Sequence, residues 1–462
     1  MLREELQKSI STEANNHLTL LESSSEFDAY RKKPSLEEMF SYDSKGFIKQ
    51  TNENCQLVLE YDELLKGAIR FNELTGKMDI VKDVPWKRFS KAFSDNDLDN
   101  IITYFEKNYG LKVDKYIERA IRIAAKENSY HPIRDFLNTL SWDGVDRISN
   151  VLTKYLGVEP TPLAIESLKL FMLGAISRVF QPGCKFEYML CFVGGQGAGK
   201  STFLRFLAIN DSWFTDDLKK LSDKDVHEHL NGHWIIEIPE MVALLHAKCV
   251  EETKSFISRQ TDNYRIPYDK FSDDHDRQCV FAGTSNRIEF LPDDKSGNRR
   301  FLPIKVDAEK AEIHILEDEE ESRAYFIQLW AQAMDVYRKG EYKLTLSKDM
   351  LEVLYAEQQQ YLPDDPKETA IVNFVEEKHP EYICPKMLHV EALGHSITDD
   401  LPKWESIEIG AILNNAFKDE YKKIGSHKFK EYGKQRTWAR IKEPAEPEFE
   451  PIQKDDESPF VD

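Results

Sequence analysis

Cysteine pairs and long apolar runs are both missing from this 462-residue chain. Its six cysteines form no Cys-x-x-Cys pair, which argues against a zinc ribbon and against a disulfide framework. We therefore expect reduced, packed thiols, as in cytoplasmic proteins. His227, His229 and His233 are closely spaced, but no HExxH motif accompanies them, so we expect no metal there.

Signals for a membrane or for export are also scarce. The start of the chain, "MLREELQKSI", mixes both charges and leads into no apolar stretch, so it lacks the pattern of a secretory signal. The apolar run "LKLFMLGAISRVF" is short for a membrane span and carries Lys169 and Arg178. We expect a buried helix in this place and a soluble, cytoplasmic protein without a membrane partner.

Positive charge is scarce overall, because the net charge is −20, but the charges are unevenly placed. Residues 307–321 and 443–462 each carry eight acids and one base, and together they contribute −14. Residues 418–442 instead carry nine bases and three acids. The acidic total therefore does not exclude a nucleic-acid partner, since local clusters of cations decide such binding.

Three short apolar runs, "YMLCFVGG", "WIIEIP" and "CVFAGTSN", predict strands that are buried on both faces. Helical segments alternate with them, and this alternation predicts an α/β fold with a three-layer arrangement around a parallel sheet.

The segment "GGQGAGKST" follows the first of these strands and matches the P-loop pattern. Its glycines let backbone N–H groups surround phosphate oxygens, and the dipole of the following helix favours the same anion. We expect Lys200 to contact the outer phosphates of ATP and Ser201 to bind Mg²⁺. The predicted nucleotide-binding residues are Gly194, Gly195, Gln196, Gly197, Ala198, Gly199, Lys200, Ser201 and Thr202.

The other two strands end in polar residues that suit hydrolysis. Glu237 is expected to hold Mg²⁺ through water, and Glu240, three residues later, suits the base that polarises the attacking water. Asn286 follows the third strand and is expected to sense the γ-phosphate. The simpler alternatives are two surface carboxylates and a turn-forming asparagine. In this order the residues are typical of a ring-forming motor of the AAA+ or superfamily 3 helicase-like type.

We predict five parts along the chain. They are a flexible lead-in (1–45), a mixed, mainly helical N-terminal domain (46–160), the P-loop ATPase core (161–345), a small winged-helix-like C-terminal domain (346–442) and an acidic disordered tail (443–462).

Two basic stretches are candidates for contact with DNA. Between the second and third strands, cations alternate with aromatic residues, a mixture that suits backbone contact and base stacking; a solvated helix and a structural hairpin explain it equally well. In the C-terminal domain, a basic wing would contact phosphates, and the alternative is a solvated basic face. The candidates are Lys254, Arg259, Arg265 and Lys270 in the first stretch and Lys428, Lys430, Lys434 and Arg436 in the second.

The P-loop, "WIIEIPE", "SRQTDNYRIPY", "AGTSN", "GNRRF" and the upstream "HPIRDFLNTLSWDGVDRI" resemble the virulence-associated protein E family, over roughly residues 52–338. The resemblance implies an ATP-driven DNA helicase or replication initiator of a prophage or chromosomal island. It also implies a hexamer in which Arg299 or Arg300 reaches the γ-phosphate of the neighbouring subunit. The N-terminal part shows no acidic metal cluster or zinc pattern, so a separate primase or host replication proteins are expected as partners.

Two other functions stay open at this point. The chain could be a nucleic-acid-responsive regulatory or defence ATPase without processive unwinding, or a small-molecule phosphotransferase in which the arginine pair covers the acceptor. The two carboxylates favour hydrolysis over transfer.

Overall fold

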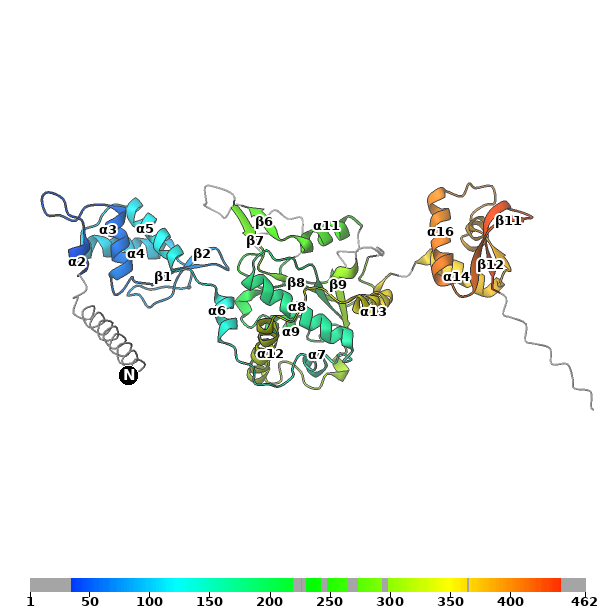
Figure 1. Ribbon diagram of the computed structural model, residues 1–462, viewed down its shortest axis with the longest axis horizontal. Helices are drawn as coiled ribbons and strands as arrows, with labels where there is room; N and C mark the ends of the chain where they lie inside the picture. The colour runs from blue at the N-terminus through cyan, green and yellow to red at the C-terminus, as the bar shows by residue number, and fades with distance from the viewer. Residues whose placement is uncertain are drawn as a thin grey trace, which may run out of the picture. The chain divides into compact units, whose positions relative to one another are not determined.

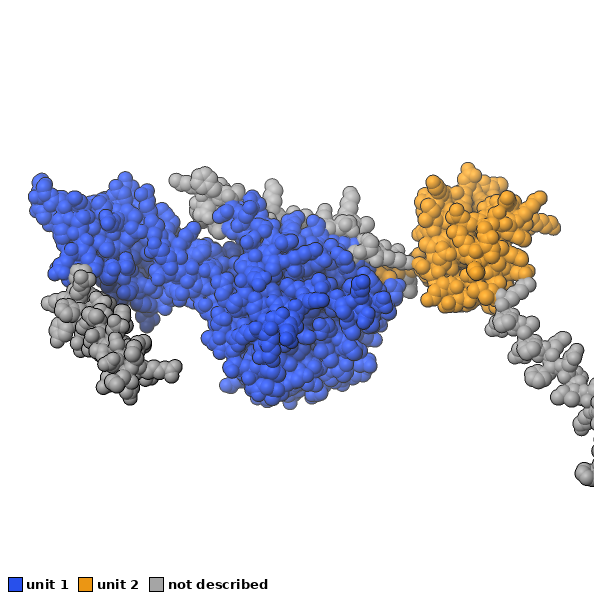
Figure 2. All heavy atoms as spheres, in the orientation of Figure 1, with its two compact units in different colours: residues 1–360 blue, residues 361–462 orange. Residues whose placement is uncertain are grey.

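The computed structural model describes residues 35–218, 226, 230–241, 247–264, 273–292, 298–363 and 365–441. The chain divides into two compact units, Met1–Gln360 and Tyr361–Asp462, which Figure 2 shows in blue and orange. Within the described part, no helix combines the length and the apolar character that crossing a bilayer requires.

The amino-terminal part of the first unit packs helices on one another and beside a small antiparallel hairpin (Figure 1). Ser94 and Asp97 form a capping box at the start of its longest helix, and Gly110 ends that helix with a φ of +64°. The elements of this part are α2 (Leu36–Met39), α3 (Asn52–Tyr61), β1 (Ile69–Asn72), β2 (Lys77–Ile80), α4 (Asp95–Tyr109) and α5 (Asp114–Glu127). The next helix, α6 (Pro132–Thr139), packs its buried residues in the main core of the unit.

The expected buried helix is confirmed as α8 (Pro162–Phe180), which follows α7 (Val151–Leu156). Thr161 caps its start and Pro162 occupies its first turn. Arg178 is almost fully buried in this helix, and its Nη atoms donate to three backbone oxygens, those of Cys279, Phe186 and Arg259. These hydrogen bonds explain how an apolar helix retains a buried cation.

The core of the first unit is a parallel sheet of five strands in the order β4-β5-β8-β3-β9. The sequence predicted an α/β fold with a parallel sheet, and this prediction is confirmed. The chain leaves β3 toward one side of the sheet and later crosses to β9 on the other side, so β3 lies at a topological switch point. The strands are β3 (Met189–Val193), β4 (Phe214–Thr215), β5 (Ile235–Ile238), β8 (Val280–Ser285) and β9 (Phe301–Lys305).

Helices pack on both faces of this sheet. On one face, α9 (Lys200–Leu207) and α12 (Glu319–Lys339) join α8 in the main hydrophobic core, where the rings of Trp234 and Trp330 lie 4.3 Å apart. On the other face, Phe256 of α11 (Ala247–Ser258) contacts Phe281 of β8. The unit also contains α13 (Lys348–Gln358) and short 3-10 turns, namely η1 (Asp211–Trp213), η3 (Asn298–Arg300), η4 (Ala308–Lys310) and η5 (Gln359–Tyr361).

An antiparallel hairpin separates α11 from β8. Its strands are β6 (Thr261–Tyr264) and β7 (Asp273–Asp276), and Asp262 and Arg277 form a buried ion pair at its base. The hairpin leads into the amino end of β8 and therefore belongs to the amino edge of the parallel sheet.

The second unit combines helices with a three-stranded antiparallel sheet in the order β10-β12-β11. Trp438 of β12 lies in its core and donates a 2.7 Å hydrogen bond to Asn414. The elements are α14 (Pro366–Lys378), β10 (Tyr382–Ile383), α15 (Pro385–Met387), the π-helix η6 (Leu388–Ala392), α16 (Lys403–Ala416), β11 (Tyr421–Phe429) and β12 (Gly433–Arg440).

Candidate functional site

The glycine-rich segment forms the loop between β3 and α9, at the carboxyl edge of the sheet. Gly197 and Gly199 have φ angles of +81° and +77°, which only glycine adopts readily. A Cβ atom on Gly194 would lie 2.5 Å from the backbone oxygen of Val306. The path of the loop itself therefore requires these three glycines.

The side chain of Lys200 turns back over this loop. Its Nζ donates to the backbone oxygens of Gly194 and Gly195, both at 2.7 Å, and to Oδ1 of Asn286 at 3.0 Å. Burial lowers the pKa of Lys200, while two nearby carboxylates act in the opposite direction. The cation is therefore held at the mouth of the loop by neutral oxygens that an anion can replace.

Glu237 lies at the carboxyl end of β5 and is completely buried. Its Oε1 accepts hydrogen bonds from Ser201 Oγ at 2.7 Å and from Thr284 Oγ1 at 2.6 Å. Its Oε2 is buried and has no hydrogen-bond partner among the described residues. Burial raises the pKa of the Glu237 carboxyl.

These contacts fit the requirements of a Mg²⁺ site. A buried carboxylate oxygen without a donor is unfavourable, and a hydrated cation satisfies it. The Ser201 hydroxyl, which is already turned toward Glu237, supplies a second oxygen of the kind that Mg²⁺ prefers. Sequence reasoning did not identify Thr284, although its position two residues before Asn286 on a strand tip was a usable signal.

Asn286 connects Lys200 to Glu240. While its Oδ1 accepts from Lys200, its Nδ2 donates to Glu240 Oε1 at 2.5 Å. Glu240 has a φ of +48°, a strained value for a residue other than glycine that costs on the order of 1–3 kcal/mol. The predicted residues of the loop, of β5 and of β8 are therefore brought together at one edge of the sheet.

Arg299 and Arg300 lie in η3, immediately before β9. Because β9 is parallel to β3, with Phe301 opposite Met189 and Lys305 opposite Val193, the arginines are at the amino edge of the sheet. The five residues of β9 span about 13 Å between the two edges. The arginines are thus separated from the Lys200 of their own chain.

The two arginines share one carboxylate but differ in exposure. Glu187 accepts a hydrogen bond from Arg299 at 3.3 Å and forms an ion pair with Arg300 at 3.5 Å. Arg300 also donates from Nε to Ser258 Oγ at 2.9 Å, and its side chain is 19% exposed, against 47% for Arg299. Arg300 is therefore the anchored member of the pair, and Arg299 the accessible one.

The candidate DNA-binding cations of the first unit have different environments. Lys254 is buried in α11, whereas Arg259 is about half exposed and lies 3.7 Å from Asp262. Arg265 and Lys270 lie outside the described residues.

The cations of the second unit are all exposed on the β11–β12 hairpin. Lys428 faces Lys434 across the two strands, and Arg436 follows two residues after Lys434, so these three share one face. Lys430 lies in the connecting turn. Within the described parts of the chain, none of the four has an ion-pair partner.

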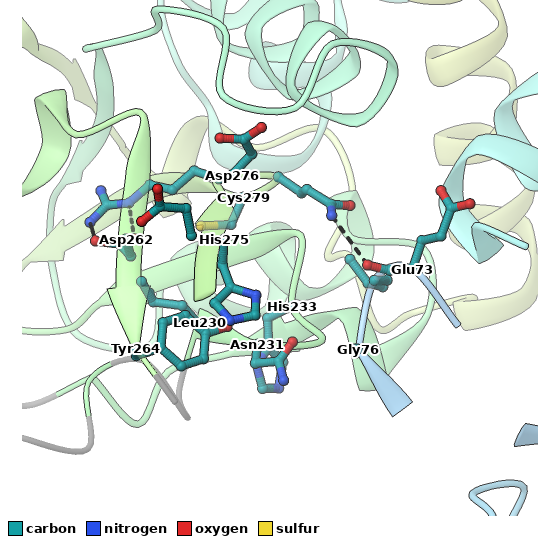
Figure 3. A pocket seen from close by; sticks show the side chains of 14 residues that line it. Glu73, Gly76, Leu230, Asn231, His233, Asp262, Tyr264, His275, Asp276 and Cys279 are labelled. Atoms are coloured by element: carbon teal, nitrogen blue, oxygen red, sulfur yellow. Dashed lines mark hydrogen bonds and ion pairs between the residues drawn. The ribbon is translucent and has the colours of Figure 1, made fainter. Parts of the chain in front are cut away.

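A pocket of about 200 Å³ lies at the amino edge of the sheet, and no residue of the glycine-rich loop lines it. Figure 3 shows the side chains that line this pocket. It is bounded by the base of the β6–β7 hairpin and by the turn that follows β1, and Gln278 donates to the backbone oxygen of Glu73 across this boundary. A second pocket, of about 340 Å³, lies beside β9 and includes Val158, Leu163 and Lys305. Neither pocket was predicted from the sequence.

Residues 137–363 match the family model of the virulence-associated protein E-like domain, which confirms the family that the ordered motifs predicted. Among solved structures, the apo C-terminal region of NrS-1 is similar at 14% identity, covering 83% of this chain and 98% of that one with a TM-score of 0.45. An A-form apo structure of the same region has 14% identity, coverages of 82% and 98% and a TM-score of 0.46. No curated protein matches.

Proposed function

Because the chain contains a virulence-associated protein E-like domain, we propose that it is an ATP hydrolase that melts or translocates on DNA as a ring during replication of a mobile element. One observation carries the proposal. Lys200, the Ser201–Glu237 pair and the Asn286–Glu240 pair converge at the carboxyl edge of a parallel sheet, beside its switch point. Open α/β sheets bind their ligands in this position.

The loop and its lysine would bind the phosphates. Backbone N–H groups of residues 194–202 and the start of α9 offer donors to the β- and γ-phosphates, and Lys200 exchanges its carbonyl contacts for phosphate oxygens. We place the nucleoside in the pocket beside β9. Lys305 lines this pocket, and the next residue, Val306, lies beside Gly194 of the loop. This part is a P-loop core in our interpretation.

Ser201 and Glu237 would hold Mg²⁺, which when bound offsets the charge that develops on the phosphates. Thr284 keeps Glu237 in place by occupying one of its oxygens and leaves Oε2 for the hydrated ion. Glu240, which is exposed to solvent, is suited to orient and deprotonate the attacking water. When phosphate replaces Asn286 as the partner of Lys200, the Asn286 side chain would be free to move. Because Asn286 also binds Glu240, the position of Glu240 would then depend on the nucleotide.

The position of the arginines supports a ring. They lie on the edge opposite to their own glycine-rich loop, so a phosphate contact requires a second copy of the chain packed head to tail. Arg299 is the better candidate for that contact because Arg300 is held by Ser258 and Glu187. A head-to-tail interface that closes gives a ring, and six subunits is the size that we propose.

DNA would be contacted at the amino edge and by the second unit. The β6–β7 hairpin projects from the edge that carries the arginines, and the cations of β11–β12 form one exposed face. We interpret the second unit as a winged-helix-like domain whose β11–β12 hairpin is the wing. In this proposal, a separate protein synthesises the primer.

Hydrolysis and unwinding in the same preparation test this function. We expect single-stranded DNA to stimulate ATP hydrolysis by the full chain, and a forked duplex to be unwound in the presence of ATP. Lys200→Ala should abolish both, whereas Lys348→Ala, an exposed lysine in the first turn of α13, should leave both unchanged. Unwinding by Lys200→Ala at the wild-type rate would overturn the proposal.

A further inference from the structure

Two histidines and a glutamate gather in the second unit, outside every site described above. They are His389, His395 and Glu405, and their ligand-type atoms all lie within 4.8 Å of one another. The sequence did not predict this group, because five and nine residues separate its members and no zinc motif has that spacing.

The backbone builds the group through an unusual turn. His389 belongs to the π-helix η6, and π-helices are rare and are often found at functional sites. Gly394 then adopts a φ of +76°, and the N–H of His395 donates to the backbone oxygen of His389 at 3.2 Å. This turn stacks the two imidazole rings with centroids 4.1 Å apart and planes within 9°. Glu405 approaches them from the first turn of α16.

One histidine of this cluster is buried without a hydrogen-bond partner among the described residues. His389 is only 2% exposed, and within the described residues neither of its ring nitrogens has a hydrogen bond. Its Nδ1 lies 3.0 Å from Glu405 Oε2, close enough for an ion pair, but the angles do not meet those of a hydrogen bond. Glu405 is also buried, while His395 is 46% exposed and so leaves one side open to solvent. Such buried groups are unfavourable unless something binds them.

We propose that His389, His395 and Glu405 bind a divalent transition-metal ion of the Zn²⁺ class. Two imidazoles and one carboxylate form a common zinc ligand set, and a fourth position remains open on the exposed side for water. Imidazole ligands favour Zn²⁺, Co²⁺ and Ni²⁺ over Mg²⁺, so the site is chemically distinct from the one at Ser201 and Glu237.

The neighbouring charges favour this assignment. Lys367 lies 4.0 Å from Glu405 Oε1 and binds Glu408 at 2.8 Å, so Glu408 offsets part of its charge. The neighbours of the Glu405 carboxylate are thus the two histidines and a lysine whose charge Glu408 partly offsets. A bound cation would join the turn after η6 to the first turn of α16 and would fix the position of one helix relative to the other.

Metal binding to the full-length chain tests the proposal. Protein freed of metal by a chelator is dialysed against Zn²⁺, bound metal is measured by mass spectrometry, and Co²⁺ absorption in the visible range reports the ligand field. We expect one equivalent of Zn²⁺ per chain. His395→Ala should weaken it by about 100-fold or more, beyond the 10–100-fold effect of residues that only support a ligand.

His379→Asn is the matched control. His379 is an exposed histidine of the same unit whose φ of +42° asparagine also tolerates, so this variant should keep both the metal and the Co²⁺ spectrum. Since His395 is exposed, its replacement should leave the far-ultraviolet circular dichroism unchanged. Two outcomes would overturn the proposal and reduce the cluster to a histidine–glutamate ion pair. In the first, the wild-type protein binds no Zn²⁺ at micromolar concentration. In the second, His395→Ala binds Zn²⁺ as well as wild type does.

Discussion

Replacing Arg299 by alanine separates a role in catalysis from a role in folding. Among the described residues, the Arg299 side chain forms its ion pair with Glu187, at 3.3 Å, and about half of the side chain is exposed. Ion pairs of this kind contribute about 0–1 kcal/mol to stability. Glu187 keeps its contact with Arg300 in the variant, so no unpaired buried charge remains. We therefore expect Arg299→Ala to unfold within about 1 kcal/mol of wild type.

The expected effect on hydrolysis is much larger. An arginine that reaches the γ-phosphate of a neighbouring subunit typically contributes a factor of ~10³ or more to kcat. A factor of 10³ corresponds to about 4 kcal/mol of activation free energy. A barrier that rises by about 4 kcal/mol, while the free energy of unfolding falls by less than about 1 kcal/mol, cannot come from local unfolding.

Arg300→Ala should affect the free energy of unfolding more, and the rate of ATP hydrolysis less, than Arg299→Ala does. Its Nε donates to Ser258 and its Nη2 contacts Glu187, so its removal also breaks the link between η3 and α11. A charge-assisted hydrogen bond of this kind contributes about 1.5–3 kcal/mol. Two measurements on both variants, the temperature of unfolding and the rate of ATP hydrolysis, distinguish the accessible arginine from the anchoring one.

Mixing inactive variants tests whether Arg299 acts on a neighbour. In a ring made from equal amounts of Arg299→Ala and Lys200→Ala chains, about one quarter of the interfaces combine an intact lysine with an intact arginine. ATP hydrolysis should therefore reappear on mixing, although each parent is inactive. Mixed rings that stay as inactive as their parents, with exchange of subunits verified, would refute the reasoning.

Three further predictions follow from buried and strained residues. Burial raises the pKa of Glu237, so its carboxylate is unfavourable at neutral pH. Glu237→Gln should therefore unfold at a higher temperature than wild type at pH 7. The difference should shrink as the pH falls below that raised pKa and should vanish below the ordinary pKa of a glutamate in the unfolded chain. Glu240→Gln should slow hydrolysis by about 10²–10⁴-fold yet leave ATP binding intact, as fluorescent-nucleotide titration would measure. Asp262→Asn leaves Arg277 buried and unpaired, and should destabilise its unit by about 3–5 kcal/mol in denaturant unfolding, whereas the exposed Asp274→Asn should not.

Short-range patterns account for what the sequence predicted well. The strand before the glycine-rich loop and the helix after it are encoded in adjacent residues, and the parallel sheet follows from the alternation of apolar strands with helices. Once the strands are parallel, the residues that follow them must meet at one edge. Lys200, Glu237 and Asn286 therefore lie together as that rule requires.

Long-range pairing accounts for what the sequence did not reveal. Glu187 binds arginines that lie more than one hundred residues further along the chain, and no local pattern identifies it as their partner. The same holds for the pocket between Glu73 and Gln278, which depends on packing between two distant hairpins. The cluster of His389, His395 and Glu405 depends on a π-helical turn, and sequence periodicity does not indicate such turns.

Strand β8 links the two edges on which the proposed function depends. Its carboxyl end leads into Asn286, which binds both Lys200 and Glu240, and its amino end follows Gln278 at the exit of the β6–β7 hairpin. All six of its residues are buried, and at a rise of about 3.3 Å per residue they span roughly 17 Å. A packed strand of this length transmits displacement with little deformation. On the proposed function, a shift of Asn286 at the phosphate therefore reaches the hairpin at the opposite edge, and hydrolysis and DNA movement need no connecting element other than the sheet itself.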